Sequence, residues 1–193
     1  MLVLASSSPR RSEYLKRLGF DFRQANPEVD ERPLGSETAR RYVRRLALEK
    51  ARAVATRFPL AWVIGADTTV VLDGLLLGKP RDCREARRML RRLSGRWHRV
   101  VSALALLSPE SGSELLESST TRVLFRKMTP AEIRWYSETG EPVDKAGAYA
   151  IQGKGGLFVE RVIGSPSNVV GFPVEAFYRL WRASGLSLPA PRS

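Results

Sequence analysis

The feature that most constrains the fold is an irregular alternation of strand-length apolar runs with amphipathic segments of helical length. Periodicity and flanking turn residues predict strands at residues 1–5, 61–65, 70–72, 75–77, 100–107, 115–125 and 157–163. Apolar residues at helical spacing predict helices that begin at Pro9, after Ser36, at Cys83, after Thr129 and at Val174. Because at least one pair of strands forms a hairpin, the pattern favours an α/β fold with a mixed sheet and flanking helices.

Turn and capping residues mark several of these boundaries. Ser8 stands as a helix N-cap, with Pro9 at the first helical position, where its missing N–H costs nothing. Asp73-Gly74 is typical of a two-residue hairpin turn. Thr129 and Glu132 have the spacing of a capping box, which predicts a helix from that point.

The length of 193 residues suits one domain, or two tightly associated lobes, and we assign residues 1–187 to it. Residues 188–193 contain Pro and Ser and are predicted to form a flexible tail. No run reaches the ~20 apolar residues of a membrane helix, and no basic region precedes the apolar N-terminal residues as it does in a signal peptide. The single cysteine, Cys83, excludes an internal disulfide and favours a cytoplasmic location.

The net charge of +12 comes almost entirely from arginine, with 26 Arg against 6 Lys. Such a surface attracts polyanions, whether nucleic acids, membrane headgroups or nucleotides. The alternative is a general preference for arginine in a heat-adapted protein, which the scarcity of Asn and Gln, two of each, also fits. Global charge therefore does not decide the function.

The segment Ser6–Arg11 reads Ser-Ser-Ser-Pro-Arg-Arg and stands where a predicted strand ends and a helix begins. Free backbone N–H groups and the positive end of the helix dipole suit an anion there. The hydroxyls add donors, and the guanidinium groups of Arg10 and Arg11 match phosphate oxygens. A well-capped helix with exposed arginines is the alternative interpretation.

Two further patterns are weak on their own. Asp67 stands in the segment Gly65-Ala66-Asp67-Thr68 at the end of the predicted strand 61–65, where its carboxylate could hold Mg²⁺ or accept a proton from an attacking water. A surface-turn aspartate is the alternative. Lys79, between Gly78 and Pro80, could supply a point charge for phosphate, although the spaced glycines and the Ser/Thr of a Walker A loop are missing.

Separated motifs follow one another along the chain: Ser6–Arg11, Val29-Asp30-Glu31, Leu46-Ala47 with Lys50-Ala51, Gly65–Thr68, Gly78–Pro80, Leu93-Ser94-Gly95 with His98, 144–149, 151–153, and 168–171 with Pro173. Their content and order over about residues 2–175 resemble the Maf family. Several motifs in the right order are far more specific than any one of them.

The resemblance implies a nucleoside triphosphate pyrophosphatase that depends on a divalent cation, Mg²⁺ or Mn²⁺. It also implies a mixed α/β fold similar to the inosine triphosphate pyrophosphatase superfamily, with two lobes around a cleft, and a homodimer is a family expectation. By similarity, the catalytic groups are Asp67, as proton acceptor, with Glu31, Lys50 and Lys79 around the phosphates, and Glu31 and Asp67 hold the metal. Ser6, Arg10 and Arg11 would bind the phosphate chain.

The family divides by base preference, and three positions place this chain by similarity. Arg10, Thr68 and Gln152 match the branch that acts on dTTP and UTP, whereas the branch acting on 7-methyl-GTP carries Trp, Gln and Glu at these places. A Gln amide offers one donor and one acceptor to the imide edge of a pyrimidine. The resemblance thus implies hydrolysis of dTTP and UTP to the monophosphate and pyrophosphate, with modified pyrimidine nucleotides as further candidates.

Two segments depart from the family pattern. Ser102-Ala103 stands where the family usually has Thr-Gly, so the hydroxyl is kept and the glycine is not. Gly164–Asn168 replaces a more common aromatic pair before the asparagine, which could shape the base pocket differently. Neither change removes a residue to which the resemblance gives a catalytic role.

As a hypothesis for the mechanism, the cation neutralises phosphate charge while Asp67 takes a proton from a water that attacks the α-phosphorus. Lys50, Lys79 and the arginines would stabilise the charge that grows on the departing pyrophosphate. The choice of the α–β bond comes from the resemblance alone.

The rival interpretation is a nucleic-acid-binding module. A basic ridge comprises Arg84, Arg87, Arg88, Arg91, Arg92 and Arg96, joined by Arg40, Arg41, Arg44 and Arg45. No recognised nucleic-acid motif accompanies these arginines, which lie on the expected solvent faces of amphipathic helices. A catalytically inactive regulator is a third possibility, against which the intact Asp67 and Glu31 speak. His98, the sole histidine, is predicted to be structural.

Overall fold

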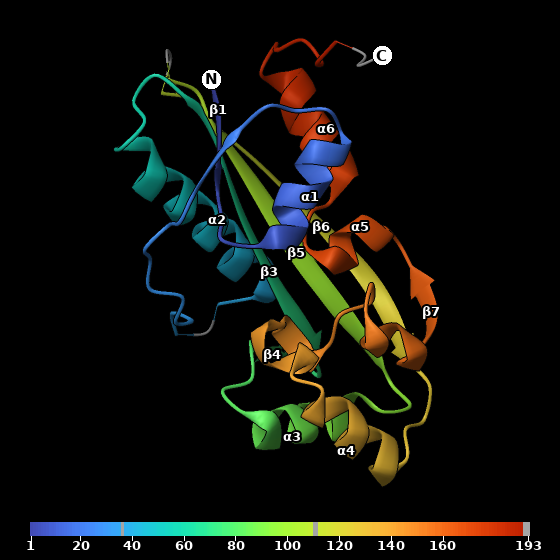
Figure 1. The fold of residues 1–193 in the computed structure, drawn as a ribbon. Coiled ribbons are helices and arrows are strands. Elements are labelled where there is room, and N and C mark those ends of the chain that lie inside the picture. The colour runs from blue at the N-terminus through green and yellow to red at the C-terminus, as the bar shows by residue number, and fades with distance from the viewer. Residues whose placement is uncertain (36, 110–111, 191–193) are drawn as a thin grey trace. The chain divides into compact units, whose positions relative to one another are not determined.

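The computed structural model describes residues 1–35, 37–109 and 112–190, and contains a seven-stranded mixed sheet (Figure 1). The strand order is β2-β1-β3-β5-β6-β7, and β4 pairs with β3 off this path. The strands are β1 (Leu2–Ala5), β2 (Arg23–Ala25), β3 (Trp62–Leu72), β4 (Leu75–Leu77), β5 (Trp97–Leu107), β6 (Glu114–Phe125) and β7 (Val159–Ile163). The helices are α1 (Pro9–Arg17), α2 (Ala39–Ala55), α3 (Cys83–Leu93), α4 (Pro130–Glu138), α5 (Pro166–Val170) and α6 (Val174–Ala183).

The chain divides into two compact units, and the long strands β3, β5 and β6 contribute residues to both. The first unit comprises Met1–Asp67, Ser102–Ser119 and Gly171–Ser193, and the second comprises Thr68–Val101 and Thr120–Val170. Each unit has its own hydrophobic core.

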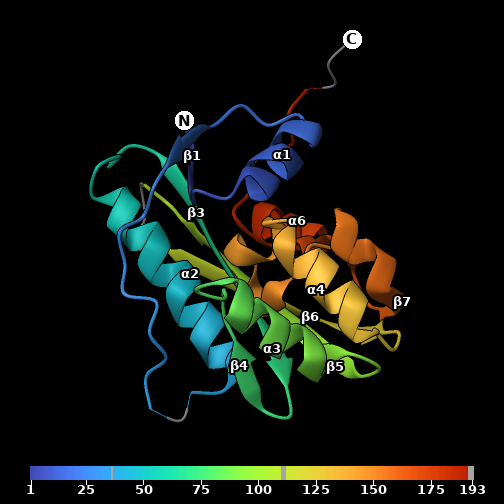
Figure 2. The ribbon, with the colours of Figure 1, turned by 60° about the horizontal axis from the view of Figure 1, so that its bottom comes forward.

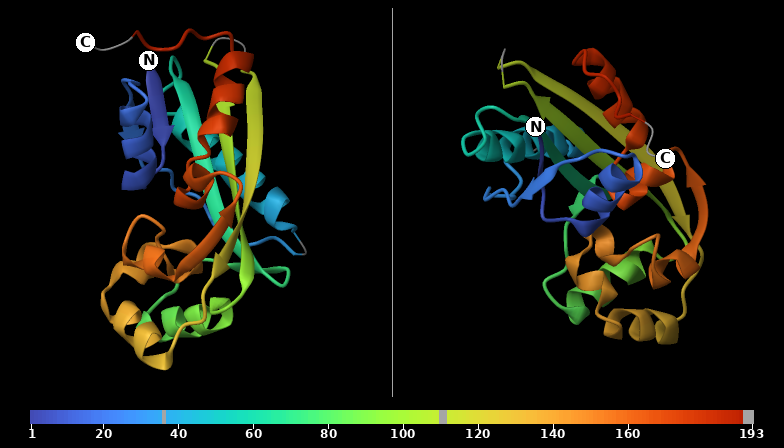
Figure 3. Two further views of the ribbon diagram at one scale, coloured as in Figure 1. Left: turned by 90° about the vertical axis from the view of Figure 1, so that its right-hand side faces the viewer. Right: turned by 45° about the horizontal axis from the view of Figure 1, so that its top comes forward.

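The first unit contains a parallel arrangement in which β1 pairs with both β2 and β3. Figure 3 shows α2 on one side of these strands and α1 and α6 on the other. The core on the α1 side joins Leu15 of α1, Ile64 of β3 and Phe177 of α6. The α2 side buries Val43, Leu46, Ala47, Lys50, Ala51 and Val54, so a lysine shares the apolar face of this helix.

Antiparallel strand pairs occur in the second unit. The turn Asp73-Gly74 connects β3 to β4, with Leu72 opposite Leu75, and β6 pairs with β7. Helices α3 and α4 lie side by side (Figure 2). Their apolar faces bury Leu90 and Ile133 in a core that also contains Phe125 and Phe158.

Most sequence predictions of secondary structure are confirmed. The sheet is mixed, the hairpin turn is where Asp73-Gly74 placed it, and Thr129 and Glu132 form both hydrogen bonds of the capping box. The second helix begins at Ala39 with Thr38 as its N-cap, whereas Ser36 lies outside the described residues. Ser8 is the N-cap of α1, although its side chain makes no capping hydrogen bond.

One prediction that bears on function was wrong. Residues 61–65 and 70–72 are not separate strands, because β3 runs without interruption from Trp62 to Leu72. Asp67 therefore lies inside a strand, not after its end. Thr68 and Thr69 are β-branched and favour the extended backbone, and a buried cation next to the Asp67 carboxylate makes its burial tolerable.

Two smaller differences concern the C-terminal third. The last strand begins at Val159, because residues 154–158 form a 3-10 helix. The short helix α5 was not predicted, and it lies where the sequence departs from the family pattern. Its Asn168 is buried and donates to the Val100 carbonyl (3.0 Å) and to the Thr121 hydroxyl (2.9 Å). Among the described residues, no helix is long and apolar enough to cross a membrane.

Candidate active site

The loop that follows β1 is fixed by side chains of the first unit. Ser6 is only 3% exposed, and its hydroxyl accepts a hydrogen bond from the Ser8 backbone N–H (3.2 Å). The Ser6 carbonyl accepts another from the side-chain amide of Gln24 on β2 (2.7 Å). The loop therefore enters α1 with its first hydroxyl held in one orientation.

Arg11 ties this loop to two other segments of the first unit. Its Nη1 donates to the Ser6 hydroxyl (3.0 Å) and to the Ala66 carbonyl (2.8 Å), and its Nε donates to the Gly171 carbonyl (3.0 Å). Burial lowers the pKa of Arg11, and the nearby Asp67 carboxylate opposes that shift. Arg11 thus contacts Ala66, the residue that precedes Asp67 in β3, and holds the loop and β3 together.

Lys50 and Asp67 form a buried ion pair between α2 and β3. The Lys50 ammonium lies 2.6 Å from Asp67 Oδ1, and the two side chains are only 7% and 8% exposed. The pair depends on Gly65, since a Cβ at that position would lie 2.0 Å from the Ala47 carbonyl oxygen and 2.8 Å from Ala51 Cβ. Only glycine lets the strand approach the helix this closely.

A second carboxylate meets the same ammonium. Lys50 Nζ also lies 2.6 Å from Glu31 Oε1, and the Glu31 side chain is 48% exposed. Burial raises the pKa of Asp67 above its ordinary value, while Lys50 and Arg11 act in the opposite direction. Asp67 therefore has a raised pKa, and the Lys50 ammonium that balances its charge is shared with the more exposed Glu31.

The segment that carries Glu31 is held by α2. The Tyr42 hydroxyl donates to the Glu31 carbonyl (2.8 Å), and Arg45 donates to the Arg32 carbonyl (3.1 Å). Burial and the neighbouring carboxylates raise the pKa of Tyr42 to about 12, so this hydroxyl keeps its proton at neutral pH. Arg45 also forms an ion pair with Glu37 (2.7 Å) at the end of the same segment.

The other predicted site residues are distributed over both units. Arg10 lies on the first turn of α1, half-buried. In the second unit, Thr68 is half-buried on β3, while Lys79 and Gln152 are exposed in the segments after β4 and before β7. The Gly78 carbonyl, next to Lys79, accepts from the Gly147 N–H (3.1 Å). Hydrogen bonds and ion pairs thus bring together Ser6, Arg11, Glu31, Lys50 and Asp67 within one unit.

Two of the predicted site residues, Glu31 and Asp67, carry carboxylates that could hold a divalent cation. Within residues 1–35, 37–109 and 112–190, no three His, Cys, Asp or Glu side chains form a group that could hold a metal. Glu31 and Asp67 provide two carboxylates around one ammonium. Mg²⁺ commonly binds one or two carboxylates together with phosphate oxygens and water, so two carboxylates suffice for that mode.

Two residues of this unit were missed from the sequence. Gln24 fixes the Ser6 carbonyl and Tyr42 fixes the Glu31 carbonyl, each through a contact that no motif indicates. The one available signal was that Tyr42 interrupts a run of arginines on the polar side of α2.

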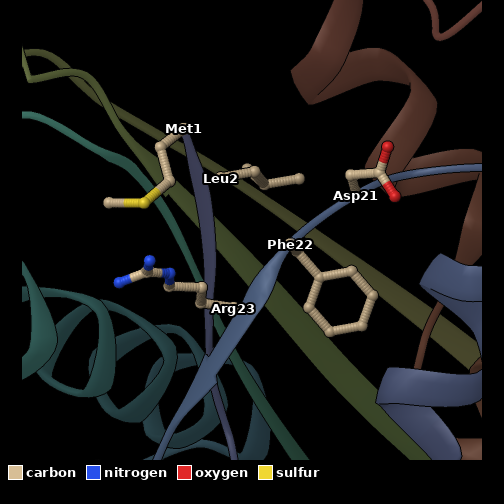
Figure 4. A pocket seen from close by; sticks show the side chains of 5 residues that line it. All are labelled: Met1, Leu2, Asp21, Phe22 and Arg23. Atoms are coloured by element: carbon tan, nitrogen blue, oxygen red, sulfur yellow. The ribbon is translucent and has the colours of Figure 1, made fainter.

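A separate cavity of about 300 Å³ lies near the N-terminus of the first unit (Figure 4). Met1 and Leu2 line it at the start of β1, and Asp21 and Phe22 line it together with Arg23, the first residue of β2. None of the predicted site residues lines this cavity.

Several arginines of the basic ridge are engaged in ion pairs inside their own unit. Arg87 of α3 contacts Glu138 (2.7 Å), Arg96 contacts Asp73 (2.7 Å), and Arg45 of α2 is paired as described. These ion pairs neutralise part of the charge of the basic ridge.

His98 lies in the core of the second unit, where it has a structural environment. It is 2% exposed, its Nε2 lies 2.8 Å from the Tyr149 hydroxyl, and its ring packs edge-on against Phe125. Burial lowers the pKa of His98 to about 4. The side chain is therefore neutral in the folded protein at pH 7, as a structural role requires.

We expect His98 to make folding sensitive to mild acid. Because the folded pKa is about 4 and the unfolded value is 6.5, the unfolded chain binds the extra proton between these values. The associated stability is complete above pH 6.5 and is lost as the pH falls toward 4, amounting to about 3 kcal/mol in full. Urea unfolding at pH 7.5 and 4.5 measures it.

The matched variant is His98→Gln, which does not titrate. The acidic residues are common to both proteins and cancel, so the variant should gain stability relative to the unmodified chain by about 2 to 3 kcal/mol between the two pH values. A pH-independent difference would show that His98 is not buried in its neutral form.

The mixed sheet with flanking helices places the chain in the fold class of the Ham1 proteins. The solved structure of the Staphylococcus aureus Ham1 protein matches it with a TM-score of 0.51 and 15% identity, covering 95% of this chain and 96% of that one. A HAM1 protein from Coxiella burnetii matches with a TM-score of 0.54 and 15% identity, covering 95% and 98%. At this identity the likeness concerns the fold alone.

The sequence comparison defines the family. The family model described as Maf-like protein matches residues 1–184, and the chain belongs to this family. A Myxococcus xanthus protein named dTTP/UTP pyrophosphatase is 52% identical over 189 residues, 98% of this chain and 95% of the relative. An Anaeromyxobacter dehalogenans protein of the same name is 53% identical, over 99% of this chain and 97% of the relative.

Proposed function

We propose that this chain is a nucleoside triphosphate pyrophosphatase that hydrolyses dTTP and UTP to the monophosphate and pyrophosphate. The observation that carries the proposal is the Lys50 ammonium shared by Asp67 and Glu31, next to a serine loop fixed by Arg11. This cluster occurs in a Maf-like protein whose relatives, about half identical over nearly the whole chain, are named dTTP/UTP pyrophosphatases.

The phosphate chain of the substrate is proposed to bind at the start of α1. Ser6 and Arg10 supply donors beside the N-terminal end of that helix, where a negative charge is favourable. Arg11 already donates to three protein acceptors, so its main contribution is to orient the Ser6 hydroxyl and add positive charge. Lys79 is proposed as a further point charge for the phosphates.

Glu31 and Asp67 are the groups proposed to hold a divalent cation, Mg²⁺ or Mn²⁺. Such a cation, when bound, neutralises phosphate charge that develops in the transition state. The close approach of both carboxylates to one ammonium supports this assignment, because the same two groups can bind a cation together with substrate oxygens.

Asp67 is also proposed to accept the proton of the water that attacks the α-phosphorus. Its raised pKa supports this role, since a carboxylate whose pKa is closer to neutral pH is a better general base. Lys50 favours the ionised form of this carboxylate and, together with Lys79, stabilises negative charge on the departing pyrophosphate. The bond between the α- and β-phosphates breaks as water oxygen bonds to the α-phosphorus.

Base preference is proposed to depend on Arg10, Thr68 and Gln152. An exposed Gln amide can donate one hydrogen bond and accept another, which matches the imide edge of thymine or uracil. Other expectations, namely a single domain over residues 1–187, a cytoplasmic location and a homodimer, stay predictions.

A panel of triphosphates with Mg²⁺ tests the proposed function. We expect dTTP and UTP to give dTMP or UMP with pyrophosphate, and EDTA to abolish turnover until excess Mg²⁺ or Mn²⁺ restores it. Release of single phosphates, or full activity in EDTA, would contradict the proposal. A parallel DNA titration at two salt concentrations tests the rival function, because phosphate-backbone binding weakens steeply with salt.

A further inference from the structure

The segment between α4 and β7 in the second unit is organised by one carboxylate, that of Glu141. Glu141 begins a short 3-10 helix, Glu141–Asp144. Its Oε1 accepts from the Tyr136 hydroxyl (2.7 Å) and the Gly155 N–H (3.1 Å), and its Oε2 accepts from the Lys154 N–H (3.0 Å). Hydrogen bonds to an ionised carboxylate are stronger than neutral ones, so these contacts form a firm anchor.

Tyr136 extends the anchor to the other end of the same loop. Its ring is fully buried in the core of the second unit, and its hydroxyl accepts from the Ala150 N–H (3.2 Å) while donating to Glu141. The two side chains together therefore hold three backbone amides, at residues 150, 154 and 155.

The glycines of the loop show how closely it fits the anchor. A Cβ at Gly155 would lie 2.5 Å from the Tyr136 hydroxyl oxygen, and one at Gly153 would lie 2.4 Å from Glu141 Oε2. Any side chain at Gly155 would also meet the Ala150 carbonyl oxygen at 2.8 Å. The loop is thus seated directly on the Glu141–Tyr136 pair.

Gln152 stands between the anchored amides of Ala150 and Lys154, with its side chain exposed. We propose that Glu141, together with Tyr136, is a positioning residue for base selection, because it fixes the loop that presents Gln152. This inference rests on the proposed function, in which Gln152 recognises the imide edge of the base. Recognition by a paired donor and acceptor requires placement within about 0.5 Å, which a loose loop does not provide.

The variant Glu141→Gln keeps the size of the side chain and removes its charge. The matched control is Glu132→Gln, which weakens another carboxylate of the second unit, one that accepts from the Thr129 N–H (2.7 Å) and pairs with Arg126 (2.8 Å). Both variants should lose some stability, so a general structural effect appears in each. Only Glu141→Gln touches the Gln152 loop.

Hydrogen exchange gives the readout that does not depend on activity. We expect the Lys154 and Gly155 amides to exchange at least about tenfold faster in Glu141→Gln, and to be unchanged in Glu132→Gln. Equal protection of these amides in Glu141→Gln and the unmodified protein would overturn the proposal.

Discrimination between UTP and CTP gives the functional readout, because these substrates differ only at the hydrogen-bonding edge of the base. The ratio of their kcat/KM values should fall by about tenfold in Glu141→Gln, and remain within about twofold in Glu132→Gln. In a Gln152→Ala background, Glu141→Gln should lower the ratio no further, since both changes act through one contact.

The outcomes separate this inference from the function on which it rests. If Gln152→Ala lowers the ratio but Glu141→Gln does not, the positioning role is wrong and the proposed base recognition stands. If Gln152→Ala itself leaves the ratio unchanged, base recognition by Gln152 is wrong, and the inference fails with it.

Discussion

Replacing Asp67 with Asn is expected to lower kcat for dTTP by about 100- to 10,000-fold, the range that general-base catalysis contributes. The amide has nearly the same size and can still accept a hydrogen bond from Lys50, but it cannot take a proton from water. Binding of dTTP should persist, which a titration with the inactive variant measures beside the turnover assay.

The matched control is Asp73→Asn, the same chemical change at an exposed aspartate of the β3–β4 turn that pairs with Arg96. Its turnover should equal that of the unmodified protein. Normal dTTP hydrolysis by Asp67→Asn would remove Asp67 from the role of proton acceptor, whatever the control shows.

Replacing Lys50 with Met is expected to lower the free energy of unfolding by about 3 to 5 kcal/mol. The loss arises because Asp67 would remain buried without its cation, and an uncompensated buried charge is strongly destabilising. Urea unfolding followed by tryptophan fluorescence measures it. The deficit should shrink as the pH falls, because protonation of Asp67 removes the unpaired charge.

Two further variants make the Lys50 result specific. Arg179→Met breaks the exposed Arg179–Glu117 pair and should cost less than about 1 kcal/mol. The double variant Lys50→Met/Asp67→Leu replaces the buried charges with apolar groups and should recover most of the lost stability. Equal losses for Lys50→Met and Arg179→Met would contradict a buried, energetically significant pair.

Much of the secondary structure could be predicted because several elements are specified by residues that lie close together in the sequence. The capping box at Thr129 and the hairpin turn at Asp73-Gly74 depend only on neighbouring residues, and both are present. Helix α3 could be placed from Ala86, Leu90 and Leu93, which repeat at helical spacing and are buried. These elements need no distant partner to be recognised.

The continuity of β3 could not be predicted in the same way. Asp67 and the two threonines after it look like a polar interruption between apolar runs. The strand continues because neighbouring strands of the sheet pair with it and because Lys50, on α2, compensates the buried carboxylate. Both causes come from parts of the chain that sequence periodicity does not connect.

The candidate site was identified by motif order rather than by geometry. Lys50 and Asp67 are 17 residues apart on different elements, and their contact depends on the absence of a side chain at Gly65. The structure gives a physical reason for that glycine. Gln24, Tyr42 and Glu141 belong to no pattern that a single sequence reveals, because each acts by holding the backbone of a distant segment.

The central claim is that water attacks the α-phosphorus of a nucleoside triphosphate and releases pyrophosphate. Hydrolysis of dTTP in water enriched in ¹⁸O, with mass analysis of both products, tests it most directly. We expect one ¹⁸O atom in dTMP and none in the pyrophosphate. Label in pyrophosphate, or release of labelled inorganic phosphate with dTDP, would contradict it.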